Sequence, residues 1–504
     1  MPHNTHRLIP ADFTPLPSLN AAAHISVVAE PSAHAEVVGY LVAPDAKIPE
    51  EVNLDWATFR TNGFEGRVGQ TLVLPRAGGP DLVAVGVGTD DERTLDVLRD
   101  TVAAFVRAAS RSAHLALRLN VNYPLDPIAI GRAVAEAALL ARYRYTALKR
   151  DPRHTPLATV EIITPHNTDA ISSGILTGVH FARAASIARD LANTPAGHLT
   201  ATVFAQLAEA KSRDFGLDVT VADKQKLIEL GCGGILGVNA GSVEEPRMII
   251  LHYTPAGRQS PEAHVALVGK GIMFDSGGIS LKPSDPMHLL MKMDMGGAAA
   301  IFGAMAVLRD LDCAVEVTAY LMCTDNMPSG SAMTLGDVLT ARNGTTIEVK
   351  NTDAEGRLVM CDALVLATEL HPDAIVDIAT LTGASLMALG QLTAPAFGNS
   401  QPLVDRVLAS AAATGEQAWQ LPLERKYRKQ LDSEIADIAN LGGKYAGATT
   451  AALFLSEFVG DTPWAHLDIA GTMQSDADDS WRSQGATGYG ARLLVDFLTT
   501  YSLS

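Results

Sequence analysis

Short apolar runs alternate with longer stretches of helical periodicity along almost the whole chain, and this alternation limits the fold more than any other feature. Strands are predicted in the first part of the chain at residues 24–30, 37–42, 71–74, 81–87, 114–119 and 159–163. Helices with apolar residues at three- and four-residue spacing are predicted at 94–110 and 130–149. Alternating strands and helices are typical of an α/β domain with a largely parallel sheet.

The same alternation resumes in the second part of the chain after a third helical stretch at 172–191. That stretch ends at Asn193-Thr194-Pro195, a helix stop followed by a turn. Further strands are predicted at 218–221, 247–253, 264–268, 316–322, 346–349 and 374–378, and helices at 297–308 and 361–370. We therefore expect a smaller N-terminal α/β domain at 1–170, a connecting helix at 171–195, and a larger α/β domain at 196–504 whose central mixed sheet is flanked by helices.

The charge of the chain bears on its partners and location. Its 56 acidic and 39 basic residues give a formal net charge of −17, and an acidic surface disfavours binding to nucleic acid or to an anionic membrane. The first 30 residues lack the pattern of a secretory signal, and no run approaches the roughly 18 apolar residues of a membrane span. A cytoplasmic protein is expected, and the four cysteines, which are far apart in apolar runs, are predicted to be buried thiols.

Ionisable residues gather beside glycines at the predicted strand ends of four segments, residues 268–283, 291–297, 351–358 and 377–384. Each residue alone has a simple explanation, since an Asp before a helix is most often an N-cap, and Gly269-Lys-Gly lacks the spacing of a phosphate loop. Ligands of open α/β sheets bind beyond the carboxyl ends of strands, so the segments are predicted to meet there. Together they supply Lys270, Asp275, Lys282, Asp294, Asp353, Glu355 and Arg357.

Four carboxylates that crowd together repel one another unless protons or cations compensate, and divalent metal is the common solution. Carboxylate ligands suit Mg²⁺, Mn²⁺ and Zn²⁺, and pairs of ions about 3.5–4 Å apart are typical of hydrolases. A lysine amine can join such ligands only when it is neutral. The chain contains no His-Glu-x-x-His pair and no Gly-x-Ser-x-Gly elbow. The residues therefore indicate a two-metal hydrolase, with a peptidase and a phosphohydrolase both open.

The segment from Asn351 to Leu358 reads Asn-Thr-Asp-Ala-Glu-Gly-Arg-Leu. It resembles the eight-residue signature of the leucyl aminopeptidase family, whose members are cytosolic two-metal enzymes. The similarity continues through residues 270–283, 294–297, 325–330, 377–383 and 464–471. The resemblance implies an aminopeptidase that removes N-terminal residues, preferably Leu or Met, from peptides by attack of a metal-bridging water. It also implies an N-terminal domain similar to macro domains and assembly as a homohexamer.

Individual roles follow from the same resemblance. One metal site would use Asp275, Asp353 and Glu355, and the other Lys270, Asp275, Asp294 and Glu355, with Mn²⁺ or Zn²⁺ at both or Mg²⁺ at one. Lys282 would polarise the scissile carbonyl, and Arg357 would hold a bicarbonate. Residues of the substrate site would be Met291, Ala470 and Met473 in an apolar side-chain pocket, and Thr380, Leu381 and Gly383 at the peptide backbone. An additional DNA-binding or scaffold role is the alternative from another class, which the acidic composition disfavours.

Overall fold

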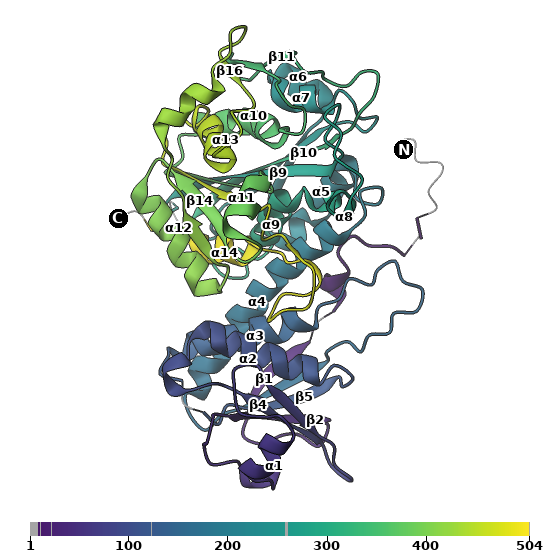
Figure 1. Cartoon of the computed structure of the whole chain (residues 1–504), viewed down its shortest axis with the longest axis vertical. Coiled ribbons are helices and arrows are strands. Elements are labelled where there is room, and N and C mark those ends of the chain that lie inside the picture. Colours follow the sequence, from purple (N-terminus) through teal and green to yellow (C-terminus); the bar gives the residue numbers. More distant parts are fainter. Residues whose placement is uncertain (1–8, 11, 22, 122, 258–260, 503–504) are drawn as a thin grey trace. The chain divides into compact units, whose positions relative to one another are not determined.

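The computed structural model describes residues 9–10, 12–21, 23–121, 123–257 and 261–502. The chain forms two compact units (Figure 1). The N-terminal unit is Pro17–Ser186 with Ser475–Gly485, and the C-terminal unit is Ile187–Gln474 with the described residues before Pro17 and after Gly485. The division at 1–170, 171–195 and 196–504, which was based on the pattern of strands and helices, stays a prediction. Such a local pattern contains no sign that residues 475–485 belong to the N-terminal unit.

The N-terminal unit is built on a six-stranded sheet in the order β1-β6-β5-β2-β4-β3, parallel except for the edge strand β3. Helices α2 and α3 pack against each other beside an apolar core. Its elements are β1 (His24–Val28), β2 (Val37–Val42), α1 (Trp56–Thr61), β3 (Thr71–Leu74), β4 (Asp81–Gly86), α2 (Leu95–Ala108), β5 (His114–Arg118), α3 (Pro127–Arg142) and β6 (Thr159–Ile163). The predicted parallel α/β sheet is confirmed.

Helix α3 ends earlier than predicted, at Arg142 rather than 149. Tyr143 leaves helical geometry with φ −59° and ψ 136°. The Arg142 guanidinium donates to the carbonyls of Val106, Ala109 and Thr155, among others. These bonds fix the helix end against the end of α2, and a local apolar pattern contains no sign of them.

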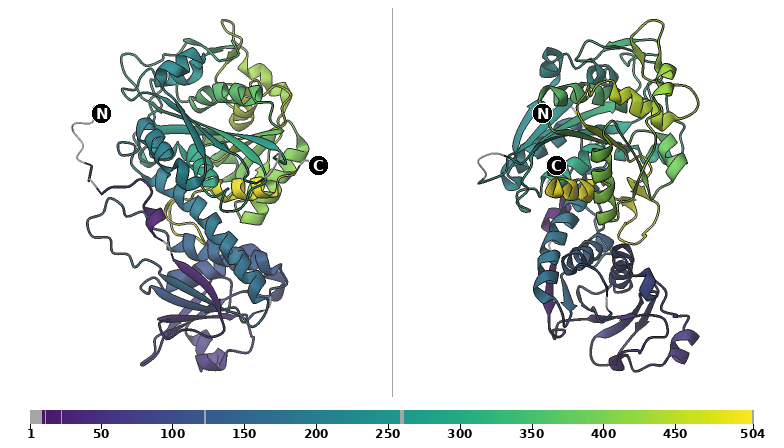
Figure 2. Two further views of the ribbon diagram at one scale, coloured as in Figure 1. Left: turned by 180° about the vertical axis from the view of Figure 1, so that it is seen from behind. Right: turned by 90° about the vertical axis from the view of Figure 1, so that its left-hand side faces the viewer.

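The C-terminal unit contains an eight-stranded mixed sheet in the order β15-β14-β17-β13-β9-β10-β8-β7. The four central strands β17, β13, β9 and β10 are parallel. Helices α7, α10 and α13 cover one face, whereas α5, α9 and α14 lie on the other (Figures 1 and 2). The sheet strands are β7 (Asp218–Ala222), β8 (Arg247–Tyr253), β9 (His264–Asp275), β10 (Glu316–Asn326), β13 (Ala374–Ala379), β14 (Ala394–Gly398), β15 (Ala418–Gln420) and β17 (Trp464–Asp468).

Further short strands are β11 (Val338–Thr340), β12 (Thr346–Glu348), β16 (Ile438–Ala439), β18 (Gln474–Ser475) and β19 (Gly485–Ala486). The long helix α4 (Thr168–Asn193) spans both units, and the remaining helices are α5 (Ala201–Phe215), α6 (Lys224–Glu229), α7 (Gly233–Asn239), α8 (Pro286–Leu289), α9 (Gly296–Met305), α10 (Gly356–Glu369), α11 (Gly383–Leu389), α12 (Gln401–Thr414), α13 (Gly447–Ser456) and α14 (Ala491–Thr500). All four cysteines are buried and unbridged, as predicted. Among the described residues no helix is long and apolar enough to cross a membrane.

Candidate metal centre

Strand β9 carries two of the candidate residues, and here the sequence prediction was wrong in detail. Lys270 and Asp275 were expected beyond a strand that stops at 268, but β9 continues to Asp275 and pairs with β10 as far as Asn326. Gly271 allows this pairing, because it has no Cβ. A Cβ at this position would lie 2.7 Å from the Met322 carbonyl oxygen of β10. Both side chains therefore project from a rigid strand rather than from a loop.

Lys270 joins three segments that are distant in the sequence. Its Nζ lies 2.7 Å from Asp294 Oδ2 and 2.7 Å from Glu355 Oε1, and it donates to the Thr380 carbonyl at 2.7 Å. The side chain is 2% exposed. Burial disfavours the ammonium form, but Asp294 and Glu355 outweigh this effect and raise the pKa of Lys270 above its ordinary value.

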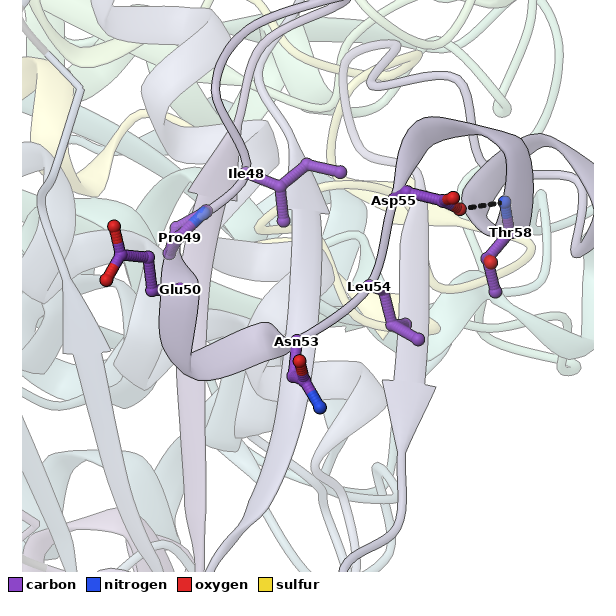
Figure 3. A pocket seen from close by; sticks show the side chains of 7 residues that line it. All are labelled: Ile48, Pro49, Glu50, Asn53, Leu54, Asp55 and Thr58. Atoms are coloured by element: carbon purple, nitrogen blue, oxygen red, sulfur yellow. Dashed lines mark hydrogen bonds between the residues drawn. The ribbon is translucent and has the colours of Figure 1, made fainter.

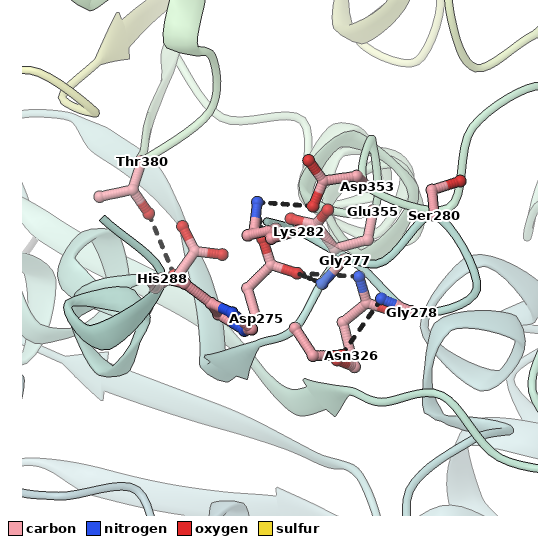
Figure 4. A network of polar contacts seen from close by, with 12 residues as sticks. Asp275, Gly277, Gly278, Ser280, Lys282, His288, Asn326, Asp353, Glu355 and Thr380 are labelled. Carbon is pink, nitrogen blue, oxygen red and sulfur yellow. Dashed lines mark hydrogen bonds and ion pairs between the residues drawn. The ribbon is translucent and has the colours of Figure 1, made fainter. Parts of the chain in front are cut away.

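Lys282, in the loop after β9, lies beside Asp353 (Figure 4). Its Nζ lies 2.8 Å from Asp275 Oδ2 and 2.5 Å from Asp353 Oδ1. The second oxygen of Asp275 accepts hydrogen bonds from the Asn326 amide and from the backbone N–H of Gly277, both at 2.9 Å. Lys282 remains 19% exposed, so its ammonium group can meet a ligand that enters the cluster.

The residues fit divalent metal. Oxygen atoms of Asp275, Asp353 and Glu355 all lie within 4.8 Å of one another, and the buried Glu355 Oε2 has no hydrogen-bond partner. Burial, and then the charge of Asp275, raise the pKa of Asp353 and Glu355 above their ordinary values. Two lysines cannot neutralise four carboxylates, and a dication would supply the missing positive charge and compete with Lys270 for its partners.

Arg357 lies in the first turn of α10, close to this cluster in sequence, and none of its hydrogen bonds goes to the four carboxylates. Its Nη1 donates to the Asn440 carbonyl at 2.9 Å, whereas the buried Nε has no partner. Burial lowers the pKa of Arg357 to about 10 against the opposing charges of Glu355 and Asp468. The guanidinium thus remains charged at neutral pH with an N–H free to bind an anion.

The predicted backbone-contact residues follow the end of β13. Thr380 donates its hydroxyl to the Asp294 carbonyl at 3.0 Å, which places it beside the cluster. Leu381 and Ala470 donate their backbone N–H groups to the same oxygen of Asp468, at 3.1 and 3.2 Å. Gly383, the first residue of α11, has open space where a Cβ would project.

The two methionines of the predicted apolar pocket flank the segment that carries Asp294. Met291 begins a short 3-10 helix at Met291–Met293, directly before Asp294. Met473 packs on Gly296, where a Cβ would approach its side-chain atoms to 2.7–2.9 Å. Both side chains are buried, so this wall beside Asp294 is apolar.

Three buried residues that the sequence interpretation did not assign also organise the site: Asn326, Asn440 and Asp468. Asn326 donates a hydrogen bond to Asp275. Asp468 accepts hydrogen bonds from the backbone of the turns that follow β13 and β17. Asn326 and Asp468 fall within the segments that resemble the aminopeptidases, which was a usable signal. Asn440 is a polar residue directly after the short apolar strand β16, and such a position does not distinguish it from a turn residue.

A hollow in the N-terminal unit is lined by residues 48–50, 53–55 and 58, none of which belongs to the candidate metal centre (Figure 3). Its acidic Asp55 accepts the backbone N–H of Thr58 at 2.7 Å and caps α1. That carboxylate therefore has a structural role in starting the helix.

The chain is similar to known proteins over most of its length. Residues 186–495 match the model of the cytosol aminopeptidase family, catalytic domain, and residues 47–152 match that of the family's N-terminal domain. A probable cytosol aminopeptidase of Nostoc punctiforme is 41% identical over 446 residues, which are 86% of this chain and 88% of that protein. One of Roseiflexus castenholzii is 41% identical over 449 residues, 87% and 91% of the two chains.

Solved structures of similar proteins cover nearly the whole chain. The bottromycin maturation enzyme BotP in complex with Mn superposes with a TM-score of 0.83 and 38% identity, covering 93% of this chain and 99% of that one. A mutant of tomato leucine aminopeptidase superposes with a TM-score of 0.86 and 32% identity, covering 95% and 97%. Both units therefore have counterparts in these two solved structures.

Proposed function

The chain belongs to the cytosol aminopeptidase family, and we propose that its activity depends on two divalent ions held by the buried carboxylates and Lys270. It is a metal-dependent aminopeptidase that releases N-terminal residues from peptides. In the proposal, one ion is bound by Asp275, Asp353 and Glu355, and the other by Lys270, Asp275, Asp294 and Glu355. The observation that carries it is the convergence of three carboxylates within 4.8 Å around an unpaired, buried Glu355 oxygen.

Mn²⁺ or Zn²⁺ at both sites, or Mg²⁺ at one, are the proposed metals, because each accepts carboxylate ligands. The Mn complex of BotP supports the choice of Mn²⁺. Such ions polarise a carbonyl and make a bound water a strong nucleophile at neutral pH. A neutral Lys270 amine is required for ligation, and a nearby dication favours that form because it disfavours the ammonium.

Lys282 and Arg357 are the proposed catalytic residues. The Lys282 ammonium, partly exposed beside Asp275 and Asp353, would donate to the scissile carbonyl oxygen and stabilise the negative charge that develops there. The Arg357 guanidinium, with its unpaired Nε, would hold a bicarbonate that takes up the proton of the attacking water.

The substrate would lie between the ends of β13 and β17. Thr380, Leu381 and Gly383 would contact its backbone, and an apolar pocket of Met291, Ala470 and Met473 would take its N-terminal side chain. The buried thioethers of the two methionines support a preference for Leu or Met over charged residues, because an unpaired charge in an apolar pocket is costly.

Assembly as a homohexamer and a cytoplasmic location complete the proposal, and both rest on the resemblance to the family. Peptides with a free N-terminus are the proposed partners, and the net charge of −17 disfavours nucleic acid. Light scattering coupled to size-exclusion chromatography measures the assembly directly, and a mass near six times 53.1 kDa is expected.

Paired peptides test the exopeptidase mechanism. After reconstitution with Mn²⁺, Zn²⁺ or Mg²⁺, the enzyme should cleave Leu-Gly-Gly and leave N-acetyl-Leu-Gly-Gly intact, since only the first offers a free amine. An endopeptidase would cleave both peptides, and a phosphohydrolase would cleave neither but would hydrolyse a phosphate ester. Equal rates for the two peptides would refute the proposal.

A further inference from the structure

The side chain of Asn440 is bonded entirely to the loop that precedes α10. Its Oδ1 accepts the backbone N–H groups of Lys350 and Asn351 at 2.8 and 3.3 Å. Its Nδ2 donates to the backbone carbonyls of Asn351 and Ala354 at 2.7 and 3.2 Å. One amide, which is 0% exposed, thus satisfies polar groups at both ends of the turn that presents Asp353.

The backbone of Asn440 extends this set of bonds in both directions. Its N–H donates to the Glu348 carbonyl at 2.9 Å, at the end of the β12–β16 pairing. Its carbonyl accepts from Arg357 Nη1 at 2.9 Å. A single residue therefore contacts the segment from the strand before the loop to the first turn of the helix after it.

We propose that Asn440 is a positioning residue that holds the loop carrying Asp353 and Glu355 in the geometry needed for metal binding. The inference rests on the proposed metal function. The loop has irregular backbone, whose buried N–H and carbonyl groups require partners, and Asn440 supplies them from 89 residues further along the chain. Its side chain makes no hydrogen bond to a carboxylate of the cluster, so it acts through the backbone of the loop.

The contribution of the Asn440 side chain to metal affinity can be estimated. Partners that orient the ligands of a metal site typically contribute about 10- to 100-fold in affinity. Losing the Asn440 amide should reduce the fraction of molecules whose loop is ready to bind, and the apparent Kd rises in inverse proportion to that fraction. Met291 and Met473, which are proposed to line the substrate pocket, lie on segments that Asn440 does not contact. Substrate binding should therefore be little affected, and KM should change less than kcat.

The test uses two variants of the full-length protein and one control. Asn440→Asp is nearly isosteric and replaces both donated bonds by repulsion between a carboxylate and two carbonyls, whereas Asn440→Ala removes all four side-chain bonds. Asn239→Asp is the matched control, since Asn239 is also buried and donates twice, to the Glu244 carbonyl and Thr324 Oγ1. Calorimetric titration with Mn²⁺, the thermal midpoint, kcat and KM are measured for each protein.

We expect Asn440→Asp to raise the Kd for Mn²⁺ about 10- to 100-fold and to lower kcat at saturating Mn²⁺, with KM within a few-fold of wild type. Asn239→Asp should lower the thermal midpoint while its Kd stays within about twofold of wild type. Wild-type Mn²⁺ affinity in Asn440→Asp, or an equal loss of affinity in the control, would overturn the positioning role. Failure of the wild-type protein itself to bind Mn²⁺ would instead refute the proposed metal function, and this inference with it.

Discussion

Replacing Gly356 by alanine should disable the site through Lys270 alone. A Cβ at this first residue of α10 would lie 2.7, 2.8 and 2.9 Å from Lys270 Cδ, Cε and Nζ. Because non-bonded carbon atoms are most stable about 3.5–4.0 Å apart, the lysine would have to move by about 1 Å. It cannot do so without losing partners, since its Nζ has three neighbours at 2.7 Å and the side chain is buried.

Helix propensity predicts that the same substitution does not destabilise the protein. Glycine is about 1 kcal/mol less favourable than alanine in a helix interior. At Gly356, the first residue of α10, this value is an upper limit, and propensity alone would make the variant at least as stable as wild type. A displacement of about 1 Å at a group that positions the reaction, however, can cost about 10²-fold in rate, which is about 2.7 kcal/mol of activation free energy. We expect kcat/KM to fall about 100-fold while the thermal midpoint stays near that of wild type.

Hydrolysis of Leu-p-nitroanilide and calorimetric titration with Mn²⁺ measure the effect of Gly356→Ala. Gly330→Ala is the matched control, because no atom outside Gly330 and its two chain neighbours lies within 4 Å of its Cβ position, and it should behave as wild type. Unchanged kcat/KM and Mn²⁺ affinity in Gly356→Ala would show that the position of Lys270 is not critical and would refute the reasoning.

Three further predictions concern the proposed roles. Asp353→Ala and Glu355→Ala should lose bound metal, measured by elemental analysis, and activity, while circular dichroism stays native; full metal content in both would exclude these ligands. Lys282→Ala should keep its metal but lose about 10² to 10³ in kcat, the typical cost of one oxyanion donor, and wild-type turnover would remove Lys282 from the mechanism. A panel of dipeptides should show Leu and Met released faster than Asp or Glu, and the reverse order would contradict an apolar pocket.

Local patterns in the sequence were enough to predict the fold class and most central strands. Strands such as β2 and β8 coincide with their predicted ranges, because a short apolar run between turn residues is itself enough to predict a buried strand. Prediction failed where the outcome depends on distant partners. β9 continues to Asp275 because β10 pairs with it, and α3 stops at Arg142 where the guanidinium meets carbonyls from elsewhere.

The sequence by itself determined which chemical groups the site could contain, since Asp353, Glu355 and Lys270 carry their charge and ligand atoms wherever they lie. Only the tertiary structure decided that Lys270 meets Thr380, 110 residues away, and that Asn440 holds the loop of Asp353. The physical reason is the range of the forces involved: periodicity and turn preferences act over a few residues. Strand order and buried hydrogen bonds are fixed only when segments far apart in the chain pack together.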